Sequence, residues 1–311
     1  MFSRRVLMVT GKGGVGKTTI VAALGSLAAQ QGKRVLVVDM EKTLETPSTL
    51  LQLLSGPANF VKDEPHLVQS SLWCARLTPR GGHLQFLSEQ LRVQMIAKAA
   101  LRSKILSRFL MATPGFQELG VIYRLLPYLR VEQETGRPPY DLVILDLPAT
   151  GHALAMTSLP EPFLEIFSTG PIEKAIREAQ SYFYDPHITA AVVVTLPEPL
   201  PVSETFELLS GLERDQVPVA GILVNRLPQD PWNAEEHTTL HSFFQQHSQR
   251  FAGEWMFRRV MRAQEAIHRL QHGLDAHPSW GVLGMLDEQW GASPQQCLTF
   301  AKNALRGGQK Q

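Results

Sequence analysis

The 311-residue sequence predicts an α/β fold, a doubly wound and mostly parallel sheet into which a helical subdomain is inserted. Two observations support this prediction. Short apolar runs rich in β-branched residues recur between longer amphipathic stretches, which is typical of strands buried on both faces by helices. About a hundred residues separate the second run from the third, far more than the roughly dozen that a minimal crossover between parallel strands needs.

The bulk composition is that of a globular chain. It is 44% apolar and 19% charged, and the net charge is +1, which argues against nucleic acid or an anionic membrane surface as a partner. No segment approaches the roughly 20 apolar residues of a spanning helix, so we expect no direct membrane span. Cys74 and Cys297 lie far apart in the sequence, which gives no disulfide framework and fits a reducing, cytoplasmic location.

The first expected strand, residues 6–10, is followed by a glycine-rich turn and a helix expected at residues 18–31. The turn satisfies the pattern GxxxxGK[ST] and reads Gly11-Lys12-Gly13-Gly14-Val15-Gly16-Lys17-Thr18-Thr19. Glycines let successive N–H groups converge on phosphates, and the helix adds the positive end of its dipole. We therefore predict a P-loop in which Lys17 bridges the β- and γ-phosphates, Thr18 ligates Mg²⁺ and Thr19 reaches the α-phosphate.

The second and third expected strands, residues 34–39 and 141–146, both end in a carboxylate. Asp39 follows a buried strand at the sheet edge where open α/β sheets bind ligands, so it is placed to orient an attacking water. Asp146 ends the third strand as a Walker B carboxylate does, and we expect it to hold Mg²⁺, partly through water. Two further strands are expected at residues 191–195 and 219–225.

The long insertion between the second and third strands has a helical pattern. Apolar residues recur at spacings of three and four from residue 84 to 110 and again from 117 to 129. We assign residues 1–80 and 137–311 to the P-loop domain, and residues 81–136, together with 159–185, to a helical subdomain. Two interpretations of its apolar face stay open: it covers the sheet, or part of it faces an apolar protein client.

Lys12 points to one family. The sequence KGGVGKTT resembles the deviant Walker A of the arsenite-pump, septum-positioning, plasmid-partition and nitrogenase iron-protein ATPases. The resemblance makes Lys12 the signature lysine that reaches the partner subunit's phosphates. The segment from Asp146 to His152 is similar to switch II of the arsenite-pump and tail-anchored-protein targeting ATPases, with Leu147 in place of Thr and Pro148-Ala149 in reversed order. His152 is either a phosphate sensor or a packed histidine.

Two later segments extend the resemblance. Residues 195–205 are similar to the family's Pro-Glu…Glu-Thr segment, and residues 221–226 to the strand that ends in an adenine-reading asparagine, here Asn225. The resemblance implies ATP rather than GTP, with Mg²⁺, as cofactors. It also implies a dimeric ATP-hydrolysing switch, either a homodimer or a heterodimer with a related ATPase, that opens and closes on an apolar protein client.

Several departures from the family pattern limit this interpretation. Of the usual switch I, Asp-Pro-Ala-His-Ser/Asn-Leu, the chain keeps Asp39, Thr43 and Leu44, which leaves the hydrolysis rate open. Two distant cysteines do not form a CxxC pair or a cluster of thiolates, so neither a zinc nor an arsenite site is expected. The alternatives are a membrane- or DNA-positioning ATPase, or a small-molecule ligase or kinase with the same P-loop. In the helical region, Glu118 is the only residue that the local pattern indicates as a candidate catalytic acid for a kinase.

Overall fold

The structure is a computed structural model that describes residues 2–40, 47–55, 63–91, 103, 115–148, 164, 168–247, 251, 253–277 and 280–288. Within these residues the chain forms an eight-stranded sheet in the order β3-β4-β2-β5-β1-β6-β7-β8. Only β3 and β4 pair antiparallel, and every other neighbouring pair is parallel. The predicted doubly wound, mostly parallel α/β fold is therefore confirmed.

The strands are β1 (Val6–Gly11), β2 (Val35–Met40), β3 (His66–Gln69), β4 (Leu72–Leu77), β5 (Leu142–Asp146), β6 (Thr189–Thr195), β7 (Val219–Leu227) and β8 (Val282–Asp287). The described helices are α1 (Lys17–Gln30), α2 (Thr49–Ser55), α3 (Pro79–Leu91), α6 (Phe116–Leu129), α9 (Pro171–Phe183), α10 (Pro199–Arg214), α11 (Ala234–Gln246) and α12 (Glu254–Asp275). All five expected strands are present, with ends shifted by one or two residues. Strands β3, β4 and β8 are not among those expected from the sequence.

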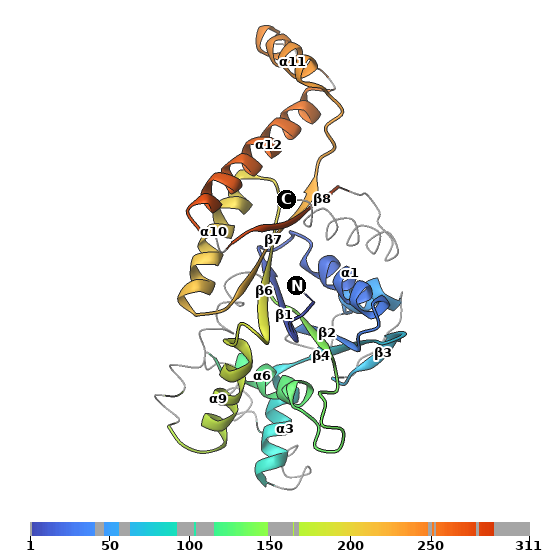
Figure 1. Cartoon of the computed structure of the whole chain (residues 1–311), viewed down its shortest axis with the longest axis vertical. Helices are drawn as coiled ribbons and strands as arrows, with labels where there is room; N and C mark the ends of the chain where they lie inside the picture. Colours follow the sequence, from blue (N-terminus) through green and yellow to red (C-terminus); the bar gives the residue numbers. More distant parts are fainter. Residues whose placement is uncertain are drawn as a thin grey trace.

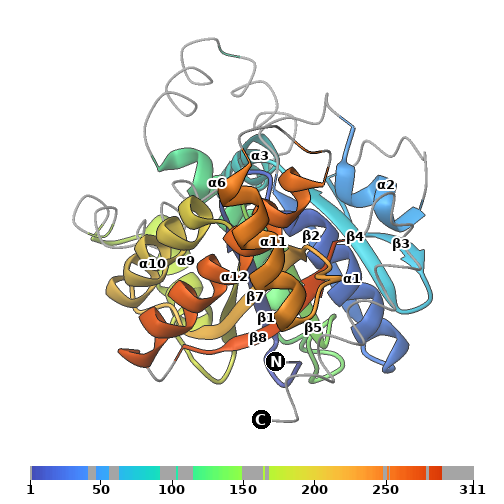
Figure 2. The ribbon, with the colours of Figure 1, turned by 90° about the horizontal axis from the view of Figure 1, so that it is seen from above.

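Alternation along the strands builds two cores, one on each face of the sheet. Val35 and Val37 of β2 belong to the core that includes α1, whereas Leu36 and Val38 belong to the core that includes α6. Figure 2 shows α1 and α2 on one side of the sheet and α9 and α10 on the other. Because both faces are covered, the central strands are apolar almost throughout, as a buried parallel sheet requires.

The helices expected in the insertion are present where the structure describes it. Helices α3, α6 and α9 gather at one end of the molecule, while α11 projects at the opposite end (Figure 1). Buried residues of α6 and α9 belong to the same core as β2, β4 and β5. The division into a P-loop domain and a helical subdomain therefore stays a prediction. No helix in the described part of the chain is long and apolar enough to cross a membrane.

The contact between α3 and α6 depends on a glycine and gives a first prediction. A Cβ at Gly120 would lie 2.6 Å from the carbonyl oxygen of Pro79 and 2.9 Å from Nε2 of His83. We expect Gly120→Ala to separate the helices and lower the free energy of unfolding by about 1–3 kcal/mol, measured by urea denaturation. The control is Gly281→Ala, because no heavy atom lies within 4 Å of the position that its added methyl group would take. Equal unfolding free energies for the two variants would contradict this account of the packing.

Candidate functional site

The predicted P-loop joins β1 to α1 at the carboxyl edge of the sheet. Gly16 precedes α1 with a left-handed φ of 93°, and a Cβ there would lie 2.4 Å from Nδ2 of Asn225. No side chain caps α1, and its first turn contains no acidic residue. The first N–H groups of the helix therefore have no side-chain acceptor at this end, which is the arrangement that binds an anion such as phosphate.

Lys17 is turned back onto its own loop. Its Nζ donates to the carbonyl oxygen of Gly11 at 3.2 Å and to that of Lys12 at 3.0 Å. Burial lowers the pKa of Lys17, and the nearby negative charge of Asp146 partly opposes that shift. Phosphate oxygens in the loop would give the ammonium group charged acceptors in place of neutral carbonyls.

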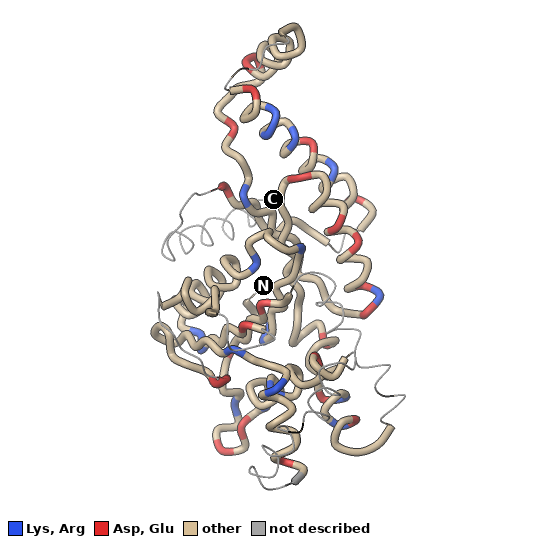
Figure 3. Tube along the Cα trace, turned by 180° about the vertical axis from the view of Figure 1, so that it is seen from behind, with Lys and Arg blue, Asp and Glu red and all other residues tan. Residues whose placement is uncertain are grey.

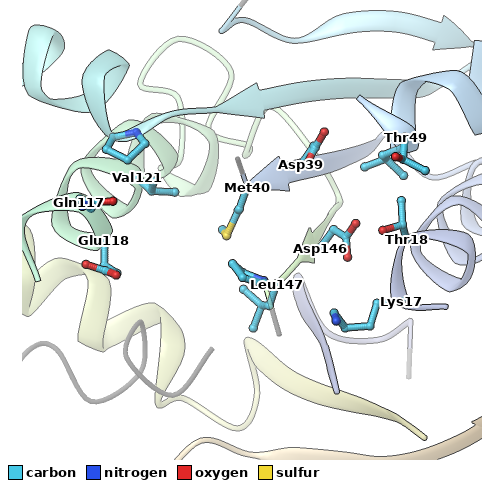
Figure 4. Close-up of a pocket in the computed structure, with 13 residues that line it drawn as sticks. Lys17, Thr18, Asp39, Met40, Thr49, Gln117, Glu118, Val121, Asp146 and Leu147 are labelled. Atoms are coloured by element: carbon cyan, nitrogen blue, oxygen red, sulfur yellow. The ribbon is translucent and has the colours of Figure 1, made fainter. Parts of the chain in front are cut away.

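Asp39 and Asp146 are register partners at the ends of the neighbouring strands β2 and β5. Together with Lys17 and Thr18 they line a cavity of about 390 Å³. Figure 4 shows the two carboxylates at their strand ends, with Lys17 and Thr18 beside them on α1. The structure thus brings together four of the predicted site residues. The Thr18 hydroxyl and the Asp146 carboxylate are oxygen donors of the kind that Mg²⁺ prefers, so these residues fit the metal.

Lys12 lies apart from this group. Its Nζ forms an ion pair with Oε1 of Glu204 on α10 at 2.6 Å, and the two side chains are 36% and 29% exposed. Lys12 is not among the residues that line the cavity. In this structure the side chain of the predicted signature lysine is therefore paired with Glu204 of its own chain.

Asn225 is 8% exposed and contacts the P-loop directly. Its Nδ2 donates to the carbonyl oxygen of Val15 at 2.8 Å, and its Oδ1 accepts from the backbone N–H of Arg226 at 3.0 Å. The family resemblance implies an adenine contact for Asn225, but no motif in the sequence indicates this support of the loop. A carboxamide has a second hydrogen and a second lone pair, so the two roles are compatible.

Asp39 has partners that the sequence did not reveal. Its Oδ2 accepts from the Ser48 hydroxyl at 2.5 Å and lies 3.7 Å from Nε of Arg76 on β4. Arg76 reaches Asp39 only because β4 pairs with β2, and no motif predicts that pairing. Glu118, the candidate acid for a kinase, lines the far side of the same cavity. Residues 41–46, His152 and Cys297 lie outside the described residues.

Comparison with known proteins identifies the family. The chain matches the family described as anion-transporting ATPase over residues 4–170 and 169–250. It belongs to this family. The resemblance predicted from Lys12 and from the segment Asp146 to His152 is thereby confirmed at the level of the family.

Several curated proteins named as ATPases are similar to this chain. ATPase BagA of Mycobacterium tuberculosis is 27% identical over 222 residues, which cover 71% of this chain and 65% of the relative. ATPase GET3B of Arabidopsis thaliana is 25% identical over 275 residues, covering 72% and 64%. Putative arsenical pump-driving ATPase 1 of Aquifex aeolicus is 27% identical over 157 residues, covering 50% and 38%. The chain thus spans slightly less than two thirds of the first two relatives.

The left-handed glycine before α1 gives a prediction for this family member. Gly16→Ala should raise the Kd for Mg·ATP at least about tenfold, because the methyl group would strike Asn225 and displace the loop. Gly32→Ala is the matched control: Gly32 has a φ of 85° and no atom within 4 Å of the added methyl position. Both variants carry the same backbone penalty of about 1–2 kcal/mol, so equal Kd values in a nucleotide-binding titration would contradict the prediction.

Proposed function

We propose that this chain is an ATP-hydrolysing molecular switch of the arsenite-pump and tail-anchored-protein targeting type, and that it works as a dimer. One observation supports the proposal most strongly: a single cavity gathers the P-loop lysine, the Thr18 hydroxyl and two strand-end carboxylates at the amino end of α1. A cation, a helix amino terminus and oxygen ligands suit the Mg²⁺ complex of a nucleoside triphosphate.

Lys17, Thr18, Asp39 and Asp146 of the cavity, together with Asn225 beside the P-loop, each have a role in this proposal. Lys17 leaves the carbonyl oxygens of its loop and binds the β- and γ-phosphates, while Thr18 and Asp146 hold Mg²⁺, Asp146 partly through water. When bound, Mg²⁺ neutralises charge on the phosphate oxygens. Asn225 uses its remaining hydrogen and lone pair on adenine, which favours ATP over GTP. Asp39 orients the water that attacks the γ-phosphate.

The dimer supplies Lys12 to the partner's nucleotide. This part of the proposal is supported by the position of Lys12, which is held by Glu204 and contributes nothing to the cavity of its own chain. In a face-to-face dimer Lys12 would leave Glu204 and stabilise charge that develops on the opposite γ-phosphate, as an arginine finger does. A homodimer and a heterodimer with a related ATPase both satisfy this arrangement.

An apolar protein client is the proposed target of the switch. A second cavity of about 100 Å³ lies between α3, α6 and α9, and its lining includes Phe86, Leu87, Phe116, Leu119 and Ile172. Such a surface suits an apolar segment of a partner. An arsenite site is not part of the proposal, because burial raises the pKa of the Cys74 thiol to about 12 and so disfavours the thiolate that would bind the metalloid. The cytoplasmic location stays part of the proposal.

Two alternatives make different demands on the same cavity. A small-molecule kinase is favoured by one observation, that Gln117 and Glu118 of α6 line the cavity opposite Lys17. It predicts that ATP is consumed only when an acceptor is added, whereas a switch releases phosphate without one.

A DNA- or membrane-positioning ATPase would need a basic surface on one side of the molecule. Figure 3 instead shows positive and negative residues interspersed along α12.

Removal of Lys12 tests the dimeric switch. Lys12→Met should leave Mg·ATP binding unchanged but lower kcat for phosphate release by about 10²–10³, since the cation that serves the partner is lost. Sedimentation should detect fewer ATP-dependent dimers for Lys12→Met than for the wild type. Asp39→Asn should instead trap the ATP-bound dimer. Lys174→Met, at an exposed position on α9, is the control. A chain that stays monomeric with Mg·ATP, and whose Lys12→Met variant hydrolyses ATP normally, would rule out the switch.

A further inference from the structure

Three charged side chains form a row along the carboxyl edge of the sheet. Arg76 of β4 is the register partner of Asp39 of β2, and Asp39 is the register partner of Asp146 of β5. Side chains of register partners point to the same face of a sheet. Two residues earlier on the same strands, Cys74 and Val37 pack in the core that contains α1. The row therefore faces α1, on the side where the P-loop ends.

Arg76 and Asp39 are buried together. Their side chains are 6% and 10% exposed, and Nε of Arg76 lies 3.7 Å from Oδ2 of Asp39. A charge buried to this extent is costly unless an opposite charge compensates it, so each group stabilises the other in place. The Ser48 hydroxyl donates to the same oxygen at 2.5 Å and also accepts from the backbone N–H of Leu51, which fixes the hydroxyl at the start of α2.

The position of Arg76 separates it from the groups that would touch the nucleotide. Asp39, Asp146 and Lys17 line the 390 Å³ cavity, and Arg76 is not among its lining residues. Arg76 stands behind Asp39, on the side away from Asp146. Without it, two neighbouring carboxylates would repel each other across adjacent strands, and Asp39 would lose the cation that fixes its direction.

We propose that Arg76 is a positioning residue for ATP hydrolysis: it holds the Asp39 carboxylate at the cavity edge, where that carboxylate orients the attacking water. This inference rests on the proposed function, which gives Asp39 that role. Arg76 itself contacts neither the nucleotide nor the water. Its removal should therefore affect the chemical step rather than the binding of Mg·ATP.

The test measures kcat and the Kd for Mg·ATP separately. Arg76→Met should lower kcat for phosphate release by about ten- to a hundredfold, because a small misplacement of a catalytic group costs that much, while Kd changes by less than about twofold. Arg76→Lys, which keeps the charge, should recover part of the loss. In an Asp39→Asn background, Arg76→Met should cause no further fall in kcat, because the residue it positions is already neutral.

Two controls separate positioning from general stability. Arg34→Met removes another Arg–Asp pair, formed by the residues directly before β2 and β5, in which Nη2 of Arg34 lies 2.8 Å from Oδ1 of Asp141 at the amino ends of these strands. This variant should keep kcat close to that of the wild type. Ser48→Ala removes a hydrogen-bond donor to Asp39 and takes away no charged side chain, and it should lower kcat in the same direction as Arg76→Met.

The outcomes distinguish this inference from the proposed function. If Asp39→Asn hydrolyses ATP at the wild-type rate, the role of Asp39 is wrong and the inference falls with it. If Asp39→Asn is inactive but Arg76→Met keeps the wild-type kcat, only the inference is overturned. A fall in kcat on Arg76→Met that is equally large in the Asp39→Asn background would also overturn it. If Arg76→Met does not fold, the other two variants decide. A wild-type kcat in both Arg76→Lys and Ser48→Ala would then overturn the inference.

Discussion

The parallel pairing of β2, β5 and β1 is the constraint on which the site depends. These three strands lie side by side in the sheet, although β2 and β5 are far apart in the sequence. Because the strands are parallel, their carboxyl ends meet at one edge, and each end contributes a different group. β1 leads into the P-loop, Asp39 is the residue before the last of β2, and β5 ends in Asp146. No single segment of the chain contains the site.

The cations near the cavity are engaged by the protein itself, and they differ in how easily they are released. The Lys12–Glu204 pair is about one third exposed, and ion pairs of this kind contribute at most about 1 kcal/mol, so a triphosphate or a partner subunit competes well for Lys12. Lys17 donates to neutral carbonyl oxygens. Arg76 is buried against Asp39, and separating two buried opposite charges is costly. We therefore expect Lys12 and Lys17 to exchange their present partners for phosphate oxygens, whereas Arg76 stays beside Asp39.

The parts of the site that the sequence predicts are those with a local signature. The P-loop is one continuous motif, and Asp39 and Asp146 each end an apolar run, so their positions at the sheet edge follow from the strand pattern. Arg76 could not be foreseen, because a charged residue inside the run 72–77 is explained only by Asp39 on the neighbouring strand. The contacts of Asn225 with Val15 and of Lys12 with Glu204 also join distant segments and depend on the order of strands.

Helix α6 joins the 390 Å³ cavity at the strand ends to the helices α3 and α9. Gln117, Glu118 and Val121 line the cavity wall opposite the P-loop, and Val121 with Leu125 also belongs to the core shared with the sheet. On its other side α6 packs closely against α3, where Gly120 leaves no space for a methyl group. A tightly packed contact does not deform gradually. Any shift of α6 that accompanies a change at the γ-phosphate must therefore move α3 with it, which gives a proposed switch a physical path from nucleotide to partner surface.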